Sequence, residues 1–103
     1  MNAEKTRKDG ARALRMEGEM TIYRAAELRE TLLASLDGVA RLDIDLSSVT
    51  ELDTAGVQLL IAAKKTAQAR QQELHLVAHS AAVLEAFETL DLAACFGDPL
   101  VVS

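Results

Sequence analysis

Aromatic residues are scarce in this sequence of 103 residues. It contains no tryptophan and only three aromatic side chains, Tyr23, Phe87 and Phe96. Proteins that bind single-stranded nucleic acid stack bases on aromatic side chains, so this scarcity argues against that function. Positive charge is also in short supply, because the formal net charge is −5. Phosphate backbones and anionic lipids both require dense positive charge, and no nucleic-acid partner is expected.

Cysteine and long apolar runs are scarce as well. The single cysteine, Cys95, excludes an internal disulfide. No charged leader followed by an apolar stretch is found, and no run is long enough to span a bilayer. We therefore expect a cytoplasmic protein without direct membrane insertion. Half of the residues are hydrophobic, which is enough for one core without metal or disulfide support. We expect a flexible polar tail over residues 1–10 and a single domain over residues 11–103.

Apolar periodicity predicts strands and helices in alternation. The expected fold class is α/β, a single domain with a mixed sheet of about four to five strands, covered by helices largely on one face. The expected core residues are Leu28, Leu32, Leu42, Ile44, Leu46, Leu59, Leu60, Leu76, Val83, Leu84 and Phe87. The expected elements are two short strands joined by a turn at Gly18 (11–23), a helix (24–36), a strand (41–46), a loop (47–52), a long helix from 54, a strand (73–79), a helix capped by Ser80, and a closing segment (95–103) with a short edge strand.

The four residues "DTAG", Asp53 to Gly56, mark the start of the long helix. Aspartate is a preferred residue at the N-cap of a helix, since its carboxylate accepts hydrogen bonds from the free amides of the first turn, and Asp53 is predicted to take this role. Thr54 places a hydroxyl at the positive end of the helix dipole, where an added phosphate is stabilised. Gly56 is costly inside a helix, by about 0.8–1 kcal/mol relative to alanine, and leaves the backbone open to a close approach. Local propensity alone does not explain this glycine.

The pattern from Asp45 to Gly56, a strand ending in "DLS", a loop and then "LDTAG" before an apolar helix, resembles the STAS domain family of sulfate transporters and anti-sigma factor antagonists. The segments "GEMTIYRAAEL" and "LHLVAHSAAVLEAFETLDLAACFGD" also resemble that family, so the likeness covers residues 11–102. It implies a partner-binding surface formed by the loop and the helix start. Its expected residues are Asp45, Ser47, Ser48, Asp53, Thr54, Ala55 and Gly56.

The resemblance implies a non-enzymatic regulator of the anti-sigma factor antagonist type, which binds a kinase-type anti-sigma factor and is switched off by phosphorylation of a serine just before the glycine. That position is Ala55 here. Either Thr54 is the phosphoacceptor, shifted by one residue, or the domain binds without a switch. A one-residue shift turns the acceptor by about 100° around the helix, which favours the second reading. A phosphate beside Asp53 and Asp45 is expected to weaken binding.

A hydroxyl followed by Ala and Gly also resembles the STAS subunit of phospholipid-transport ABC complexes, where the partner is the ATPase subunit. This is the alternative function. An enzyme is not expected, because the acids Asp45 and Asp53 have no basic partner or phosphate loop near them in the sequence. No cofactor and no metal are expected. His75 and His79 share one face of the predicted strand, but no third ligand completes a zinc site.

Overall fold

Three long parallel strands form the centre of the computed structural model, which describes residues 2–3 and 10–90. The sheet order is β1-β2-β3-β4, and β1 alone runs antiparallel to its neighbour. The elements in chain order are β1 (Asn2–Ala3), β2 (Ala11–Met20), the 3-10 turn η1 (Ile22–Arg24), α1 (Ala25–Ser35), β3 (Arg41–Leu52), α2 (Thr54–Ala69), β4 (Glu73–His79) and α3 (Ala81–Leu90).

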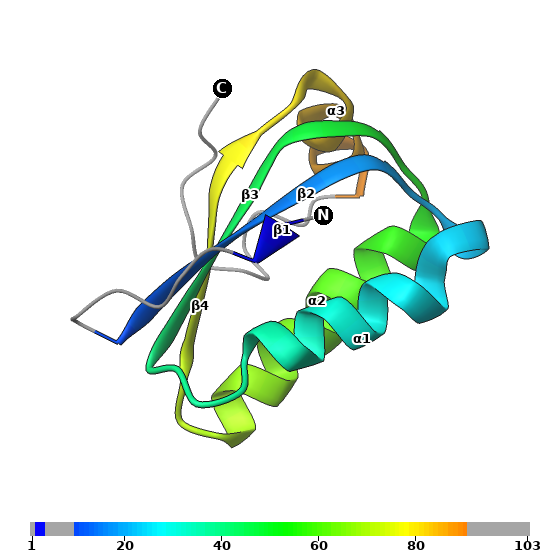
Figure 1. Ribbon diagram of the computed structural model, residues 1–103. Helices are drawn as coiled ribbons and strands as arrows, with labels where there is room; N and C mark the ends of the chain where they lie inside the picture. The colour runs from blue at the N-terminus through cyan, green and yellow to red at the C-terminus, as the bar shows by residue number, and fades with distance from the viewer. Residues whose placement is uncertain (1, 4–9, 91–103) are drawn as a thin grey trace.

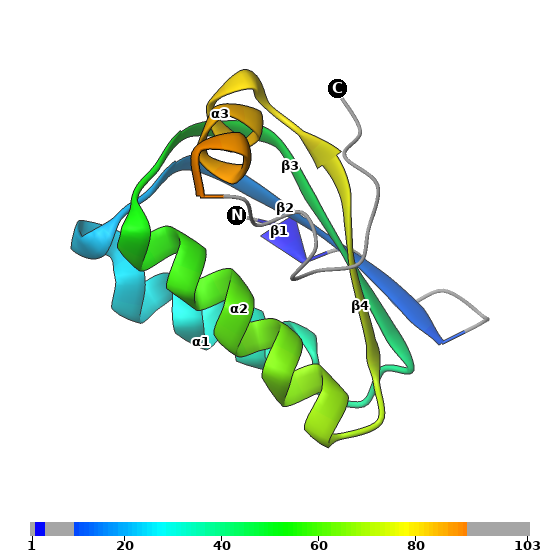
Figure 2. The same cartoon turned by 180° about the vertical axis from the view of Figure 1, so that it is seen from behind.

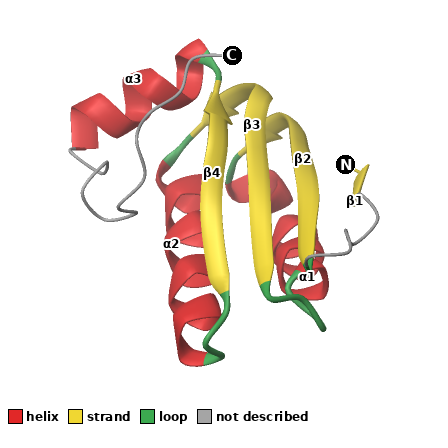
Figure 3. Ribbon diagram, turned by 90° about the vertical axis from the view of Figure 1, so that its left-hand side faces the viewer, coloured by secondary structure: helices red, strands yellow, loops and turns green. Residues whose placement is uncertain are grey.

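The helices follow the crossover rule for parallel strands. Helix α1 connects β2 to β3 and helix α2 connects β3 to β4, so both pack side by side against one face of the sheet (Figure 1). The reverse view shows α2 in front of α1, with both helices on the same side of the sheet (Figure 2). Helix α3 follows β4 and lies near the ends of β3 and β4, apart from the α1–α2 layer (Figure 3). The α/β class is confirmed. The sheet, predicted to be mixed with about four to five strands, has four strands in the described residues, of which only β2, β3 and β4 are long and parallel.

Strand β2 is continuous, and the prediction of two strands with a turn at Gly18 is wrong. Gly18 has φ +75°, but it lies within the pairing of β2 with β3. The register shifts between Arg15 and Glu17 and again between Gly18 and Glu19. At both shifts the extra residue lies in β3, so Gly18 lies opposite a bulge of β3, and β2 continues beyond the glycine.

Strand β3 is longer than predicted, and the loop expected over residues 47–52 is wrong. Its second half pairs with β2, from Ser48 opposite Glu17 to Leu52 opposite Met20. Val49 is 2% exposed, so this polar segment still contributes an apolar side chain to the core. Polar residues suggested a loop, whereas long-range pairing with β2 keeps the segment extended.

The core lies between the sheet and its helices. Nine of the eleven predicted core residues are buried, whereas Leu59 and Leu84 are only partly buried. Further residues that the prediction left out also belong to this core: Leu14, Met16, Met20, Leu36, Val49, Val57, Ala63, Ala67 and Leu74. The N-cap predicted at Ser80 is confirmed, since its Oγ accepts a hydrogen bond of 3.3 Å from the Val83 amide.

The two ends of the chain are described only in part. Within the tail predicted over residues 1–10, Asn2–Ala3 pair with Arg15 and Leu14 as strand β1. Residues 4–9 of that tail, Cys95 and the edge strand predicted in 95–103 lie outside the described residues.

His75 and His79 do not share a face of β4. The register with β3 shifts between Leu76 and Ala78, so the strand gains one residue and its alternation is reversed beyond that point. His79 is fully buried, with its ring edge-on to Phe87 at 5.7 Å between centroids, while the side chain of His75 is 38% exposed.

Candidate functional site

The carboxyl ends of the three parallel strands meet at one edge of the sheet. Strand β2 leads there into η1, strand β3 leads into α2, and strand β4 leads into α3. Open parallel sheets commonly place their binding sites at this edge. The chain segments that follow the three strands therefore form the candidate site.

Asp53 joins two of these segments with one carboxylate. Its Oδ1 accepts a hydrogen bond of 3.0 Å from the Gly56 amide, which is the N-cap contact predicted from the sequence. Its Oδ2 accepts a second bond of 3.0 Å from the Ile22 amide, 31 residues away. The Asp53 amide also donates to the carbonyl of Met20 at 3.3 Å. The start of α2 is thus fixed to the end of β2.

Gly56 is required by the packing of α2 against β2. A Cβ at this position would lie 2.2 Å from the carbonyl oxygen of Met20 and 2.6 Å from Leu52 Cδ1. Neither distance allows a carbon atom, and the carbonyl is a backbone group that the sheet holds in place. The close approach expected from the sequence is therefore an approach of α2 to the protein's own strand.

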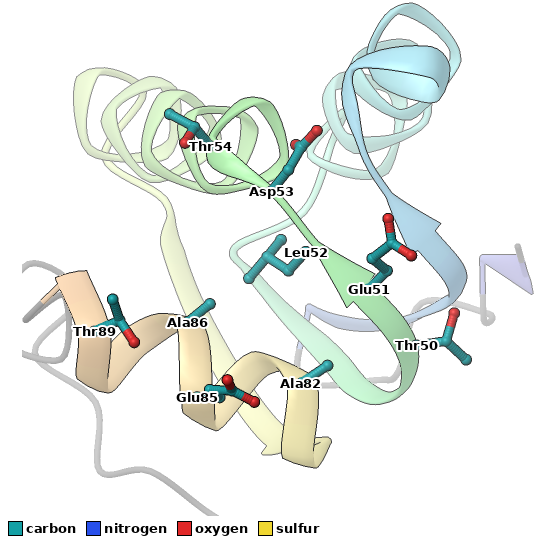
Figure 4. A pocket seen from close by; sticks show the side chains of 9 residues that line it. All are labelled: Thr50, Glu51, Leu52, Asp53, Thr54, Ala82, Glu85, Ala86 and Thr89. Atoms are coloured by element: carbon teal, nitrogen blue, oxygen red, sulfur yellow. The ribbon is translucent and has the colours of Figure 1, made fainter.

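Thr54 lies at the exposed first position of α2 and lines an open groove of about 430 Å³. Figure 4 shows the groove between the β3–α2 junction and α3. Ala55 is half-buried and does not line it. The lining residues are Thr50, Glu51, Leu52, Asp53, Thr54, Ala82, Glu85, Ala86 and Thr89. The groove contains three carboxylates and no lysine or arginine.

Asp45, Ser47 and Ser48 lie in the middle of β3, away from the helix start. Six residues of strand separate Asp45 from Leu52, which corresponds to roughly 20 Å along the strand. Asp45 Oδ1 accepts from the Ser47 amide at 2.8 Å, and Oδ2 lies 3.7 Å from Arg15 Nε. Asp45 is therefore not at the exit of the strand, and the expectation that it lies near Thr54 is wrong.

The pKa values of both aspartates are lowered. For Asp53 the main causes are the hydrogen bonds from the Gly56 and Ile22 amides, which stabilise the ionised carboxylate. For Asp45 burial acts in the opposite direction, but the hydrogen bonds from Ser47 and the charge of Arg15 outweigh it. Both pKa values are shifted by structural contacts, and a lowered pKa does not suit a general base near neutral pH.

The sequence interpretation missed Ile22 and Tyr23 of η1. Their side chains are 63% and 89% exposed, although both are large and apolar. The sequence signal was present as "TIY", but these residues were assigned to a strand, where alternate residues are buried. The hydrogen bond from the Ile22 amide to Asp53 brings this turn next to the predicted site.

The described chain holds no group of three or more His, Cys, Asp and Glu side chains placed to bind a metal ion. No helix within residues 10–90 has the length and apolar character needed to cross a bilayer.

This fold, with its site at the β3–α2 junction, matches a known domain family. A family model described as "Mlab, STAS domain" matches residues 3–102, and the chain belongs to the STAS domain family. An anti-sigma-B factor antagonist of Staphylococcus aureus is 27% identical over 93 residues, which are 89% of this chain and 86% of that relative.

Two solved structures share the fold. An anti-sigma factor antagonist from Mycobacterium paratuberculosis superposes with a TM-score of 0.81 at 24% identity, covering 99% of this chain and 84% of its own. The anti-sigma factor antagonist SpoIIAA in its unphosphorylated form superposes with a TM-score of 0.74 at 13% identity, covering 99% and 88%. At these identities the likeness shows the fold alone.

Asp53→Asn is expected to destabilise the protein in a pH-dependent manner. A carboxylate whose pKa is lowered on folding stabilises the fold above its unfolded pKa of about 3.9, and this contribution is lost as the pH falls through the folded value. The difference in unfolding free energy between wild type and variant should be constant above about pH 5 and shrink below about pH 4. Urea denaturation across this range measures it.

The matched control is Asp37→Asn, which removes an exposed carboxylate with no side-chain hydrogen bond in the described structure. Its effect should be small at every pH. An Asp53→Asn effect of equal size at pH 3 and pH 7 would show that ionisation of Asp53 contributes nothing.

Proposed function

We propose that this domain is a non-enzymatic cytoplasmic regulator of the anti-sigma factor antagonist type. It docks on a kinase-type anti-sigma factor and needs no cofactor. The observation that carries the proposal is the 27% identity with the Staphylococcus aureus antagonist along 89% of the chain. The fold shared with two further antagonists supports it.

The docking surface is centred on the start of α2. Asp53, Thr54 and Ala55 lie there together with the backbone of Gly56, and Thr54 is exposed to solvent. Our proposal excludes Asp45, Ser47 and Ser48 from this surface, because they belong to the middle of β3. Thr50 and Glu51, which line the groove beside Thr54, take their place.

We favour binding without a phosphoryl switch. SpoIIAA is known in a phosphorylated form as well, so phosphorylation occurs within this fold. In this chain the carboxylate of Asp53 already accepts a hydrogen bond from the Gly56 amide in the first turn of α2. A phosphate on Thr54 would compete with that carboxylate for the same dipole end, and like charges oppose one another there. Thr54 therefore acts as a contact residue.

The test is a titration of the purified chain with a kinase-type anti-sigma factor from the same organism, with and without its sigma factor. We expect saturable binding that releases the sigma factor, and an unchanged intact mass of the chain after incubation with the kinase and ATP. Stoichiometric phosphate on Thr54 with loss of binding would overturn the role of Thr54 as a plain contact.

The alternative partner is the ATPase subunit of a phospholipid-transport ABC complex. A second titration measures the binding of the chain to this subunit. The relatives named as antagonists do not favour it. Binding to the ATPase alone would replace the proposed function by the alternative one.

A further inference from the structure

Two large apolar side chains stand exposed beside the helix start. Ile22 is 63% exposed and Tyr23 is 89% exposed, and the two are consecutive in η1. Exposed apolar residues on a monomer are ordinary when scattered singly, whereas an adjacent pair next to a candidate site indicates a contact surface. Tyrosine is also enriched among the residues that dominate protein interfaces.

The turn is held rigidly although its side chains are free. The Ile22 amide is bonded to Asp53 Oδ2 at 3.0 Å. Arg24 Nη1 donates to the carbonyls of Glu17 and Glu19 at 2.9 and 2.8 Å, and its Nε donates to Glu27 Oε1 at 2.9 Å. A turn fixed on both sides loses little conformational entropy when a partner binds.

An uncompensated pair of carboxylates lies next to this turn. Glu19 and Glu51 are register partners on the adjacent strands β2 and β3. Like charges opposite one another on neighbouring strands destabilise a sheet. Within the part of the chain that the structure describes, neither carboxylate takes part in an ion pair or a hydrogen bond. Arg24, the nearby cation, is occupied by Glu27 and the two carbonyls.

We propose that Ile22 and Tyr23, flanked by Glu19 and Glu51, form the second half of the docking surface. The occupant is a protein partner that offers an apolar pocket for Tyr23 with a lysine or arginine at its rim. The inference rests on the proposed function, because it extends the surface at Thr54. Charge complementarity argues against a second copy of this chain, since a symmetric contact would bring the same carboxylates together.

The experiment measures the affinity of Tyr23→Ala for the kinase-type anti-sigma factor. We expect the dissociation constant to rise by about tenfold or more, as for an interface anchor. Val77→Ala is the matched control, because Val77 is also an exposed large apolar residue, at 41%, but lies on β4. It should change the constant by less than about twofold.

Charge is tested with the double variant Glu19→Gln/Glu51→Gln. Its binding should be about threefold to tenfold weaker at low salt and equal to wild type at high salt, where such charges are screened. Glu30→Gln, which removes an exposed carboxylate of α1, is the control and should have no effect.

Tyr23 is the only tyrosine of the chain, so fluorotyrosine incorporation gives a single ¹⁹F resonance at this position. The resonance should shift when the anti-sigma factor is added. Normal affinity of Tyr23→Ala and an unshifted resonance would overturn the inference and leave the proposed function intact. A wild-type chain that binds no anti-sigma factor would overturn both. A resonance shift that depends on the concentration of the chain alone would instead identify a second copy as the occupant.

Discussion

Replacing Gly56 by alanine is expected to lower the free energy of unfolding by about 3 kcal/mol or more. The new Cβ would lie 2.2 Å from the Met20 carbonyl oxygen and 2.6 Å from Leu52 Cδ1. Alanine gains about 1 kcal/mol of helix propensity over glycine, but overpacking against a backbone group outweighs it. Since domains of this size are stable by only about 5–15 kcal/mol, the variant loses a large share of its stability. Urea denaturation of both proteins measures the change.

Gly38→Ala is the matched control for this prediction. Gly38, unlike the helical Gly56, has a positive φ of +73°, and no atom lies within 4 Å of the position of its missing Cβ. Gly38→Ala should therefore lower the free energy of unfolding only by the cost of placing alanine in a left-handed backbone conformation, about 1–2 kcal/mol. A Gly56→Ala variant that is no less stable than Gly38→Ala would mean that α2 moves away from β2 at little cost.

Replacing Thr54 by glutamate is expected to weaken binding to the anti-sigma factor by about 2 kcal/mol or more, or roughly thirtyfold. Thr54 borders a groove that already holds the carboxylates of Glu51, Asp53 and Glu85. Solvent screens these charges in the free protein, but docking removes that solvent and leaves the added charge beside Asp53. Isothermal titration calorimetry gives the difference in affinity.

Two controls separate size from charge at this position. Thr54→Gln has nearly the size of the glutamate variant without its charge and should bind more tightly than that variant. Thr54→Ala loses the hydroxyl alone and should cost about 0.5–1.5 kcal/mol, the worth of one hydrogen bond. Tighter binding of Thr54→Glu than of Thr54→Gln would place a partner cation at Thr54 and contradict the prediction.

Local patterns were sufficient for much of the fold. The helical spacing of Leu28 and Leu32 and the alternation of Leu42, Ile44 and Leu46 predicted buried faces that the structure confirms. These faces are set by the period of the element itself, so neighbouring residues carry the information.

Features that depend on distant segments were not predictable in this way. The second half of β3 has a polar sequence, but it is extended because it pairs with β2. No pattern within residues 47–52 indicates that pairing. The bulge in β4 that reverses the direction of His79 is likewise a property of two strands.

The candidate site shows the same division. The capping role of Asp53 follows from its place before a helix and is confirmed by the bond from Gly56. Its second bond, to the Ile22 amide, joins residues 31 apart and has no local signal. The exposure of Tyr23 depends on the chain leaving the sheet after Met20, which the predicted strand boundaries did not show.

The shared carboxylate of Asp53 makes the two halves of the surface thermodynamically linked. One oxygen holds the first turn of α2 and the other holds the turn that carries Tyr23. A partner that tightens one of these bonds restricts the carboxylate and so restricts the other turn. An event that draws the carboxylate away from α2 therefore lowers the affinity for a partner at Tyr23. By reciprocity, a partner bound at Tyr23 lowers the equilibrium constant of that event by the same factor. This chain can therefore transmit a change across its docking face through a single side chain, without movement of the sheet.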